Sequence, residues 1–213
     1  MSRYDYEYEW DILYCYPDSH VLKNKLIILD SETLATAERE ITAARIAEIM
    51  DKPVRGNFDF NHLQAIHHAI FRDIFEWAGV PRTVDISKGN QFCLYRHLNT
   101  YAGGIFDTLN KEEFLRCVTA NDMPERLAYY MSEINVLHPF RDGNGRTQRV
   151  FIEYLAQCAG FDVDFSSVSG DEMIEACALS FAKEYTMMIK MFKRITTKIS
   201  PEEQIMYCNQ ILK

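Results

Sequence analysis

The side chains that can do chemistry are concentrated in the twelve residues from 138 to 149. They read His-Pro-Phe-Arg-Asp-Gly-Asn-Gly-Arg-Thr-Gln-Arg. A histidine, a carboxylate, two glycines and arginines in so short a stretch are typical of a phosphate site with a base beside it. His138 is the candidate base, because an imidazole can take the proton of a hydroxyl that attacks a bound phosphorus.

The middle of this stretch predicts an anion-binding loop that leads into a helix. Gly143 and Gly145 permit tight or left-handed backbone and the close approach of a ligand. A helix that begins near Arg146 has first N–H groups without internal partners, and these attract an anion. Arg146 and Arg149 can each bind phosphate oxygens with a guanidinium fork. Asp142 is a hard oxygen ligand suited to Mg²⁺ on a polyphosphate.

Two commoner phosphate-binding motifs do not fit this loop. It lacks the Gly-x-x-x-x-Gly-Lys-Ser/Thr of a P-loop, and it lacks the Gly-x-Gly-x-x-Gly of dinucleotide-binding folds. The residues alone therefore predict a phosphate-binding loop with a base. They define neither the nucleotide nor the phosphorus that is attacked.

Composition narrows the class of protein. The chain has 213 residues, of which 47% are hydrophobic and 25% charged, as expected for one globular domain with a small extension. The net charge of -8 argues against nucleic-acid binding through a broad basic face. The six cysteines are scattered, which favours reduced thiols in a cytoplasmic protein. We expect neither a secretory signal nor a membrane span, because no apolar run approaches about 18 residues.

The apolar pattern predicts an all-α protein, a bundle of about eight helices with one small β-hairpin. Apolar residues at helical spacing predict helices over 31–50, 61–77, 100–109, 112–119, 124–137, 146–159, 185–194 and 201–213, with another after the capping box at Ser169. The hairpin is expected within 82–94, with its turn at Lys88–Asn90. The helix 124–137 should end at His138, because Pro139 disfavours helical geometry in the residue before it.

The stretch from His138 to Arg149 resembles the signature of the Fic family (filamentation induced by cAMP) and matches it at every motif position. Further similarity to Fic sequences lies at Ile66–His67, Trp77-Ala78-Gly79, Ile86-Ser87-Lys88-Gly89 and Glu133-Ile134-Asn135, and residues 18–25 resemble the start of short bacterial Fic toxins. This resemblance implies the Fic fold. It also implies an N-terminal segment (1–57) with a regulatory helix at 31–50, a catalytic core (58–195) and a C-terminal tail (196–213).

The resemblance implies that the protein transfers AMP from ATP to a Ser, Thr or Tyr hydroxyl of a target protein or of itself, and releases pyrophosphate. The family's roles fall on matching positions: His138 deprotonates the hydroxyl, Asp142 holds Mg²⁺, Gly143, Asn144 and Gly145 cradle the α-phosphate region, and Arg146 and Arg149 bind the outer phosphates. Glycine at 145 favours AMP transfer, because related Doc-type kinases carry lysine there and transfer a terminal phosphate. The hairpin with Lys88 and Gly89 resembles the Fic flap, which clamps the target by strand-like pairing.

Regulation is open between three interpretations. Similar proteins are held inactive by a helix reading Ser/Thr-x-x-x-Glu-Gly/Asn, whose glutamate pairs with the second motif arginine, here Arg149. Ser31 opens the first predicted helix, but Ala35 stands where that glutamate would be. The chain is then a toxin that needs a separate antitoxin, or a copy in which Ala35 has relieved autoinhibition by its own helix. In the third interpretation Ala35 is simply a good helix former.

The same residues leave two alternative functions open. A different nucleotide or phosphate-linked group, such as UTP or CDP-choline, is one alternative, and a non-catalytic interaction module is another. The expected partners are a target protein, an antitoxin and a second copy of the chain, with no nucleic acid and no membrane. His62, His67 and His68 do not share a helical face, so we expect structural roles rather than a metal site. The tyrosine-rich residues 4–16 favour packing, a protein interface or self-modification.

Overall fold

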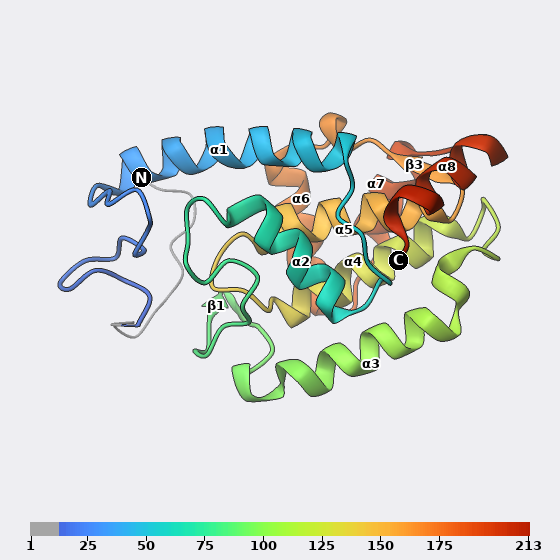
Figure 1. Ribbon diagram of the computed structural model, residues 1–213. Coiled ribbons are helices and arrows are strands. Elements are labelled where there is room, and N and C mark those ends of the chain that lie inside the picture. Colours follow the sequence, from blue (N-terminus) through green and yellow to red (C-terminus); the bar gives the residue numbers. More distant parts are fainter. Residues whose placement is uncertain (1–12) are drawn as a thin grey trace.

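The computed structural model describes residues 13–213 (Figure 1). The aromatic residues from Tyr4 to Trp10 lie outside this part, so the interpretation of that run stays a prediction. Tyr14, which is described, packs its ring edge against Trp77, and its hydroxyl accepts a hydrogen bond from the Thr83 N–H at 3.2 Å. Tyr14, within the tyrosine-rich residues 4–16, is therefore part of the packed core.

The described residues form a helical bundle with two small sheets. Its helices are α1 (Ser31–Asp51), α2 (Phe60–Phe71), α3 (Leu98–Lys111), α4 (Met123–Leu137), α5 (Asn144–Cys158), α6 (Gly170–Phe181), α7 (Thr186–Ile195) and α8 (Pro201–Ile211). Its strands are β1 (Ser87–Lys88) and β2 (Asn90–Gln91), which form a hairpin, and β3 (Phe161–Val163) and β4 (Thr196–Lys198). The predicted mainly helical class with a small hairpin is confirmed.

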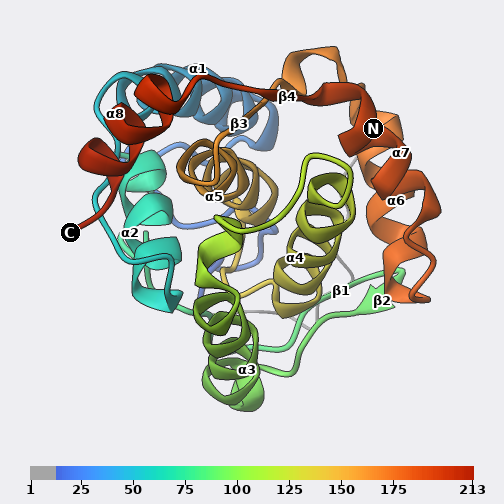
Figure 2. The same cartoon turned by 90° about the vertical axis from the view of Figure 1, so that its right-hand side faces the viewer.

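Helix α5 is the centre of the bundle. Figure 2 shows it nearly end-on, with α1, α2, α4 and α8 around it. It is buried on most sides, because Phe151, Tyr154 and Leu155 are fully buried and Val150 nearly so. A helix that is apolar around most of its circumference must lie inside a core. The loop 138–143 precedes this helix, so its position is set by a buried element of the core.

Helix α4 ends where the sequence predicted. His138 follows its last residue and adopts a left-handed conformation, with φ 42° and ψ 60°. Pro139 explains the stop, since it disfavours the right-handed helical region for the preceding residue. A left-handed backbone is uncommon for a histidine, so the surrounding contacts must hold it there.

Three local predictions were wrong. The helix expected over 61–77 ends at Phe71, and the chain then turns so that Ile74 and Phe75 enter the core. The helix expected over 112–119 is a short 3-10 turn at Glu113–Leu115, whose three residues have positive φ. Strands β3 and β4 were not predicted, because Phe161 pairs with Lys198 across two intervening helices and no local pattern announces such a pair.

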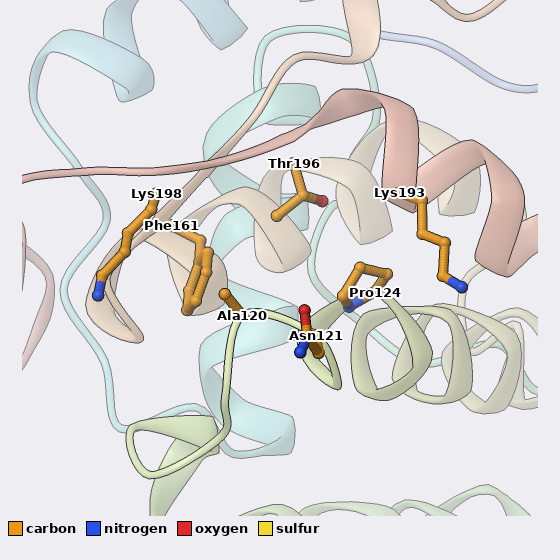
Figure 3. Close-up of a pocket in the computed structure, with 7 residues that line it drawn as sticks. All are labelled: Ala120, Asn121, Pro124, Phe161, Lys193, Thr196 and Lys198. Atoms are coloured by element: carbon orange, nitrogen blue, oxygen red, sulfur yellow. The ribbon is translucent and has the colours of Figure 1, made fainter.

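A hollow of about 370 Å³ lies at the far end of α4 from His138 (Figure 3). Its lining consists of Ala120, Asn121, Pro124, Phe161, Lys193, Thr196 and Lys198. None of these residues belongs to the motif, so this hollow is separate from the candidate phosphate site. No helix in the described part of the chain is long and apolar enough to cross a membrane.

Candidate active site

His138 presents one ring nitrogen as a proton acceptor. Its Nδ1 lies 3.1 Å from the carbonyl oxygen of Asn135. A carbonyl can only accept, so Nδ1 carries the proton and Nε2 keeps its lone pair. Nε2 is buried and has no hydrogen-bond partner among the described residues. Such an orphaned acceptor is costly unless it serves a ligand or a reaction.

Burial keeps this imidazole neutral. It lowers the pKa of His138 to about 3, and the positive charges of Arg82 and Lys88 act in the same direction. At neutral pH the ring is therefore unprotonated and able to accept a proton.

The flap covers the base. The ring of Phe92, one residue past β2, stacks on the imidazole of His138 with centroids 3.7 Å apart and planes 14° apart. His138 is 7% exposed and its Nε2 is inaccessible. A substrate hydroxyl therefore reaches Nε2 only when this contact opens.

The loop after His138 turns at a glycine whose surroundings leave no room for a Cβ. Gly143 has φ +80°, and a Cβ there would lie 2.3 Å from Cζ of Phe71. Asp142 caps the turn, with Oδ1 accepting from the Gly143 N–H at 2.6 Å. The first hydrogen bond of α5 runs from the Thr147 N–H to the Gly143 carbonyl, so the N–H groups of residues 144–146 precede the bonded part of the helix. These are the groups at which the sequence predicts an anion.

Asn144 braces the loop with its side chain. Its Oδ1 accepts from the Phe140 N–H at 2.9 Å, and its Nδ2 donates to the Phe140 carbonyl at 2.8 Å. The side chain is thus committed to the protein, and only the main chain of Asn144 is available to a phosphate. Gly145 is different from Gly143, because its nearest neighbour for an added Cβ is Nη1 of Arg149 at 3.6 Å.

Arg146 is engaged by helix α1. It forms an ion pair with Glu38, donates to Oγ1 of Thr42 at 3.1 Å, and lies over the ring of Phe71 at 4.7 Å. Desolvation, followed by the charge of Asp142, raises the pKa of the Glu38 carboxyl. Sequence reasoning missed Glu38, since nothing in the pattern of α1 distinguishes it from the helix's other glutamates.

The two residues named for regulation lie elsewhere on α1. Ser31 is the first residue of the helix, whose cap is Asp30, and Ala35 is exposed. The carboxylate of α1 that reaches the motif is Glu38, and it contacts the first motif arginine, Arg146.

His67 supports the loop from helix α2. Its Nε2 donates to the carbonyl oxygen of Asp142 at 3.0 Å, and its Nδ1 accepts from the Gly79 N–H at 2.8 Å. Its ring stacks on Phe140 with centroids 3.8 Å apart, and burial lowers its pKa to about 3. The histidines of α2 therefore hold backbone, as His62 also does through the Val54 carbonyl at 2.8 Å.

Arg82 is a second residue that sequence reasoning missed. It is buried, and its Nε donates to the His138 carbonyl at 2.9 Å. Its Nη1 donates to the Val84 carbonyl at 2.7 Å and its Nη2 to the Cys93 carbonyl. One side chain thus connects the base to both ends of the flap.

The flap itself is a tight antiparallel hairpin. Ser87 pairs with Gln91 and Lys88 with Asn90, with Gly89 at φ +70° in the turn and no atom within 4 Å of the position of its missing Cβ. Desolvation lowers the pKa of Lys88, and the charge of Asp142 opposes this shift, so Lys88 lies within the field of the loop carboxylate. In the described part of the chain this sheet has two strands, and its main-chain edge is available for pairing.

A neutral base at a helix end, a glycine loop and arginines on the next helix define a class of helical proteins that transfer phosphate-linked groups. The chain belongs to the Fic/DOC family, which its residues 57–156 match. The Salmonella typhimurium protein named probable protein adenylyltransferase Fic is 41% identical over 158 residues, which cover 73% of this chain and 78% of the relative. The Escherichia coli protein of the same name is 34% identical over 89% of this chain and 94% of its own.

A longer relative and two solved structures extend the comparison. Protein adenylyltransferase VbhT of Bartonella schoenbuchensis is 37% identical over 90% of this chain, which spans only 40% of VbhT. The structure of BepC from Bartonella tribocorum with bound AMPPNP has a TM-score of 0.84 and 27% identity, and covers 88% of this chain and 97% of its own. An N-terminal Fic domain from Bartonella quintana with bound ADP has a TM-score of 0.87 and 26% identity, with coverage of 92% and 100%.

Proposed function

We propose that the protein is a protein adenylyltransferase, which transfers AMP from ATP to a Ser, Thr or Tyr hydroxyl of a target protein. The observation that carries this proposal is the unpartnered Nε2 of neutral His138 beside the N-terminus of α5. The hydroxyl oxygen attacks the α-phosphorus while its proton passes to Nε2. The bond from the α-phosphorus to the bridging oxygen breaks, and pyrophosphate leaves.

The N-terminal end of α5 supplies the phosphate site in this proposal. The N–H groups of residues 144–146 bind phosphate oxygens, and the helix dipole favours their charge. Arg149 lies beside Gly145, where it can bind the outer phosphates. Arg146 can do the same once a phosphate replaces Glu38 as its anionic partner. The bound AMPPNP and ADP of the related structures support a nucleotide in this place.

Asp142 fits a magnesium ion carried by the nucleotide. One carboxylate oxygen is used by the Gly143 N–H, and the other makes no hydrogen bond to a described residue. Mg²⁺ typically takes one or two carboxylates and completes its shell with phosphate oxygens and water. The described residues contain no cluster of three metal-ligating side chains, so this proposal gives the ion one protein ligand, Asp142. The ion would neutralise phosphate charge, while Asp142 holds it and its own backbone stays fixed by His67.

The flap is the proposed docking element for the target. An extended target segment can pair with the hairpin edge by main-chain hydrogen bonds, which would place its hydroxyl near His138 once Phe92 moves. We assign the reaction to the cytoplasm, since the six cysteines are free thiols, as in a reducing compartment.

The first prediction tests the transfer itself. Wild-type protein incubated with a cell lysate, Mg²⁺ and ATP labelled at the α-phosphate should label protein bands. His138→Ala should lower the labelling rate by roughly 10²–10⁴-fold, because it removes the general base. Label from ATP labelled at the γ-phosphate, with none from ATP labelled at the α-phosphate, would show a kinase instead. Equal labelling by His138→Ala would refute the proposal.

A further inference from the structure

A second hollow, of about 320 Å³, lies between α3 and α4. Its lining consists of His97, Thr100, Tyr101, Gly104, Ile105, Tyr129 and Glu133. No residue of the 138–149 motif takes part. We call this hollow the tyrosine pocket.

The Glu133 carboxyl group of α4 lies beside Tyr101 of α3 and Tyr129 of its own helix. The Tyr101 hydroxyl of α3 donates to a Glu133 carboxylate oxygen at 2.8 Å. Burial, followed by the Glu133 contact, raises the pKa of Tyr101, and burial followed by the Glu133 charge raises the pKa of both Tyr129 and Tyr185. All three phenols therefore lie within the field of one carboxylate, although Tyr185 precedes α7, far along the chain.

This carboxylate has no cationic partner in the described part of the chain. No lysine or arginine there forms an ion pair with Glu133. Arg126, two turns earlier on the same face of α4, is paired with Glu112, and its guanidinium lies over the ring of Tyr129 at 4.8 Å. Arg96 lies at the rim, where its Nε bonds the ring of His97 at 3.4 Å. Gly104 leaves space, because an added Cβ would meet no atom within 4 Å. A carboxylate between aromatic walls attracts a cation by charge and by cation–π contact.

A short stretch of chain joins the flap to the tyrosine pocket. His97 closes the 3-10 turn η1 (Tyr95–His97), which follows β2 and leads into α3 (Figure 2). The Cys93 N–H, between β2 and this turn, donates to the Val136 carbonyl of α4 at 2.9 Å. Both the end of the flap and the pocket therefore lie against the last turns of α4, which end at the base.

The separation along α4 is short enough for one extended polypeptide to span. Glu133 precedes His138 by five residues, which is about 7.5 Å along a helix axis. An extended strand advances about 3.3 Å per residue. A long basic side chain within about five residues of the modified hydroxyl can therefore reach the pocket.

We propose that the tyrosine pocket is a specificity subsite that receives a lysine or arginine side chain of the target protein. The proposal rests on the proposed transfer to proteins. Glu133 supplies the charge, and Tyr101 and Tyr129 supply the aromatic walls. Targets with a basic residue near the accepting hydroxyl are then preferred over targets without one.

Binding is tested with small probes on the full chain. Nα-acetyl-arginine amide should shift the backbone amide NMR signals of Tyr101, Gly104 and Glu133, and the neutral isostere Nα-acetyl-citrulline amide should not. Glu133→Gln should abolish these shifts while its amide oxygen still accepts from Tyr101. The matched control is Glu125→Gln, an exposed acid on the same helix. Equal shifts by both probes, or shifts that survive Glu133→Gln, would overturn the proposal.

Selection of targets is tested by mapping labelled sites in a lysate. Wild-type sites should carry Lys or Arg within about five residues, and Glu133→Gln should lower their labelling roughly tenfold, the effect of about 1.4 kcal/mol. Unchanged labelling by Glu133→Gln would mean that the pocket does not select target proteins, even if it binds the small arginine probe, and this would refute the subsite. Absence of label from the wild type would refute the transfer itself, whereas the probe experiment still reports on the pocket.

Discussion

The two glycines of the phosphate loop have different physical roles. Gly143 has a positive φ, and the ring of Phe71 fills the position that a Cβ would occupy, so glycine is required here for steric reasons. Gly145 has no positive φ, and the guanidinium of Arg149 is the one group near its missing Cβ, so we propose that it leaves space for a ligand. Both positions are glycine in the motif, and only the surrounding residues in the fold distinguish their roles.

The second prediction uses the two glycines as a matched pair. Gly143→Ala should destabilise the protein by at least ~2 kcal/mol, through backbone strain and the clash with Phe71. Gly145→Ala should leave the free energy of unfolding unchanged or raise it by up to about 1 kcal/mol, because alanine favours a helix. It should nevertheless lower AMP transfer, because its methyl group takes space beside Arg149. Urea unfolding and labelling rates measure both, and a severe loss of stability in Gly145→Ala would contradict this division.

At the scale of elements, one arginine fixes the position of the flap relative to the base. Arg82 donates to the carbonyls of Val84 and Cys93, which precede and follow the hairpin. It also donates to the carbonyl of His138. The flap can therefore move only between its two anchored ends. Motion of Phe92 away from His138 is then a local opening, not a detachment of the whole segment.

The third prediction removes this anchor. Arg82→Met should lower the free energy of unfolding by several kcal/mol, since each buried carbonyl left unpaired costs about 1–3 kcal/mol. It should also reduce AMP transfer more than ATP binding, because the flap and base lose their alignment. Arg39→Met, an exposed position on α1, is the control for losing an arginine. A variant as stable as the control would show that Arg82 is not an anchor.

Helix α1 reaches the phosphate site through a single carboxylate. Glu38 is paired with the guanidinium of Arg146, which in the proposed function binds a nucleotide phosphate. We therefore propose that the helix competes with the nucleotide from a position one turn beyond Ala35. The earlier hypothesis about Ala35 stays a prediction, and Glu38 offers a second residue for the same role.

The fourth prediction measures this competition. Glu38→Gln should lower the KM for ATP several-fold, because a neutral amide holds Arg146 less tightly. Glu40→Gln, exposed on the same helix, should leave the KM unchanged. Ala35→Glu should raise the KM only if a glutamate there reaches Arg149. An unchanged KM in Glu38→Gln would mean that the ion pair is structural.

At the scale of the whole molecule, buried neutral histidines couple stability to pH. Burial lowers the pKa of His67 and of His138 to about 3, whereas both bind a proton near pH 6.5 in the unfolded chain. Between these values the unfolded state holds more protons, so stability is complete above about pH 6.5 and falls as the pH falls towards 3.

The fifth prediction follows from this linkage. The free energy of unfolding should decrease below about pH 6.5, with a limiting slope of about 1.4 kcal/mol per pH unit for each of the two histidines. Urea unfolding from about pH 7.5 to about pH 5.5 measures the slope. It is compared with that of Glu153→Gln, because burial raises the pKa of Glu153 to about 7 and its proton uptake in the fold opposes the effect of the histidines in this window. His67→Gln should reduce the slope, and exposed His97→Gln should not. A flat profile in Glu153→Gln would show that neither ring stays neutral in the fold.

The sequence by itself determined the features that neighbouring residues encode. Helical spacing, Pro139 and Gly143 sufficed for the helical class, the end of α4, the hairpin of β1 and β2 and the left-handed turn that leads into α5, because each depends on residues within a few positions of one another.

Only the tertiary structure decided how these parts are held. Arg146 meets Thr42 across 104 positions, His67 meets Asp142 across 75, and Arg82 meets His138 across 56. The pairing of β3 with β4, the early end of α2 and the tyrosines around Glu133 likewise depend on distant segments. Such contacts are selected by packing of the whole core, and side chains that look alike along the chain acquire different roles only when that packing brings their partners to them.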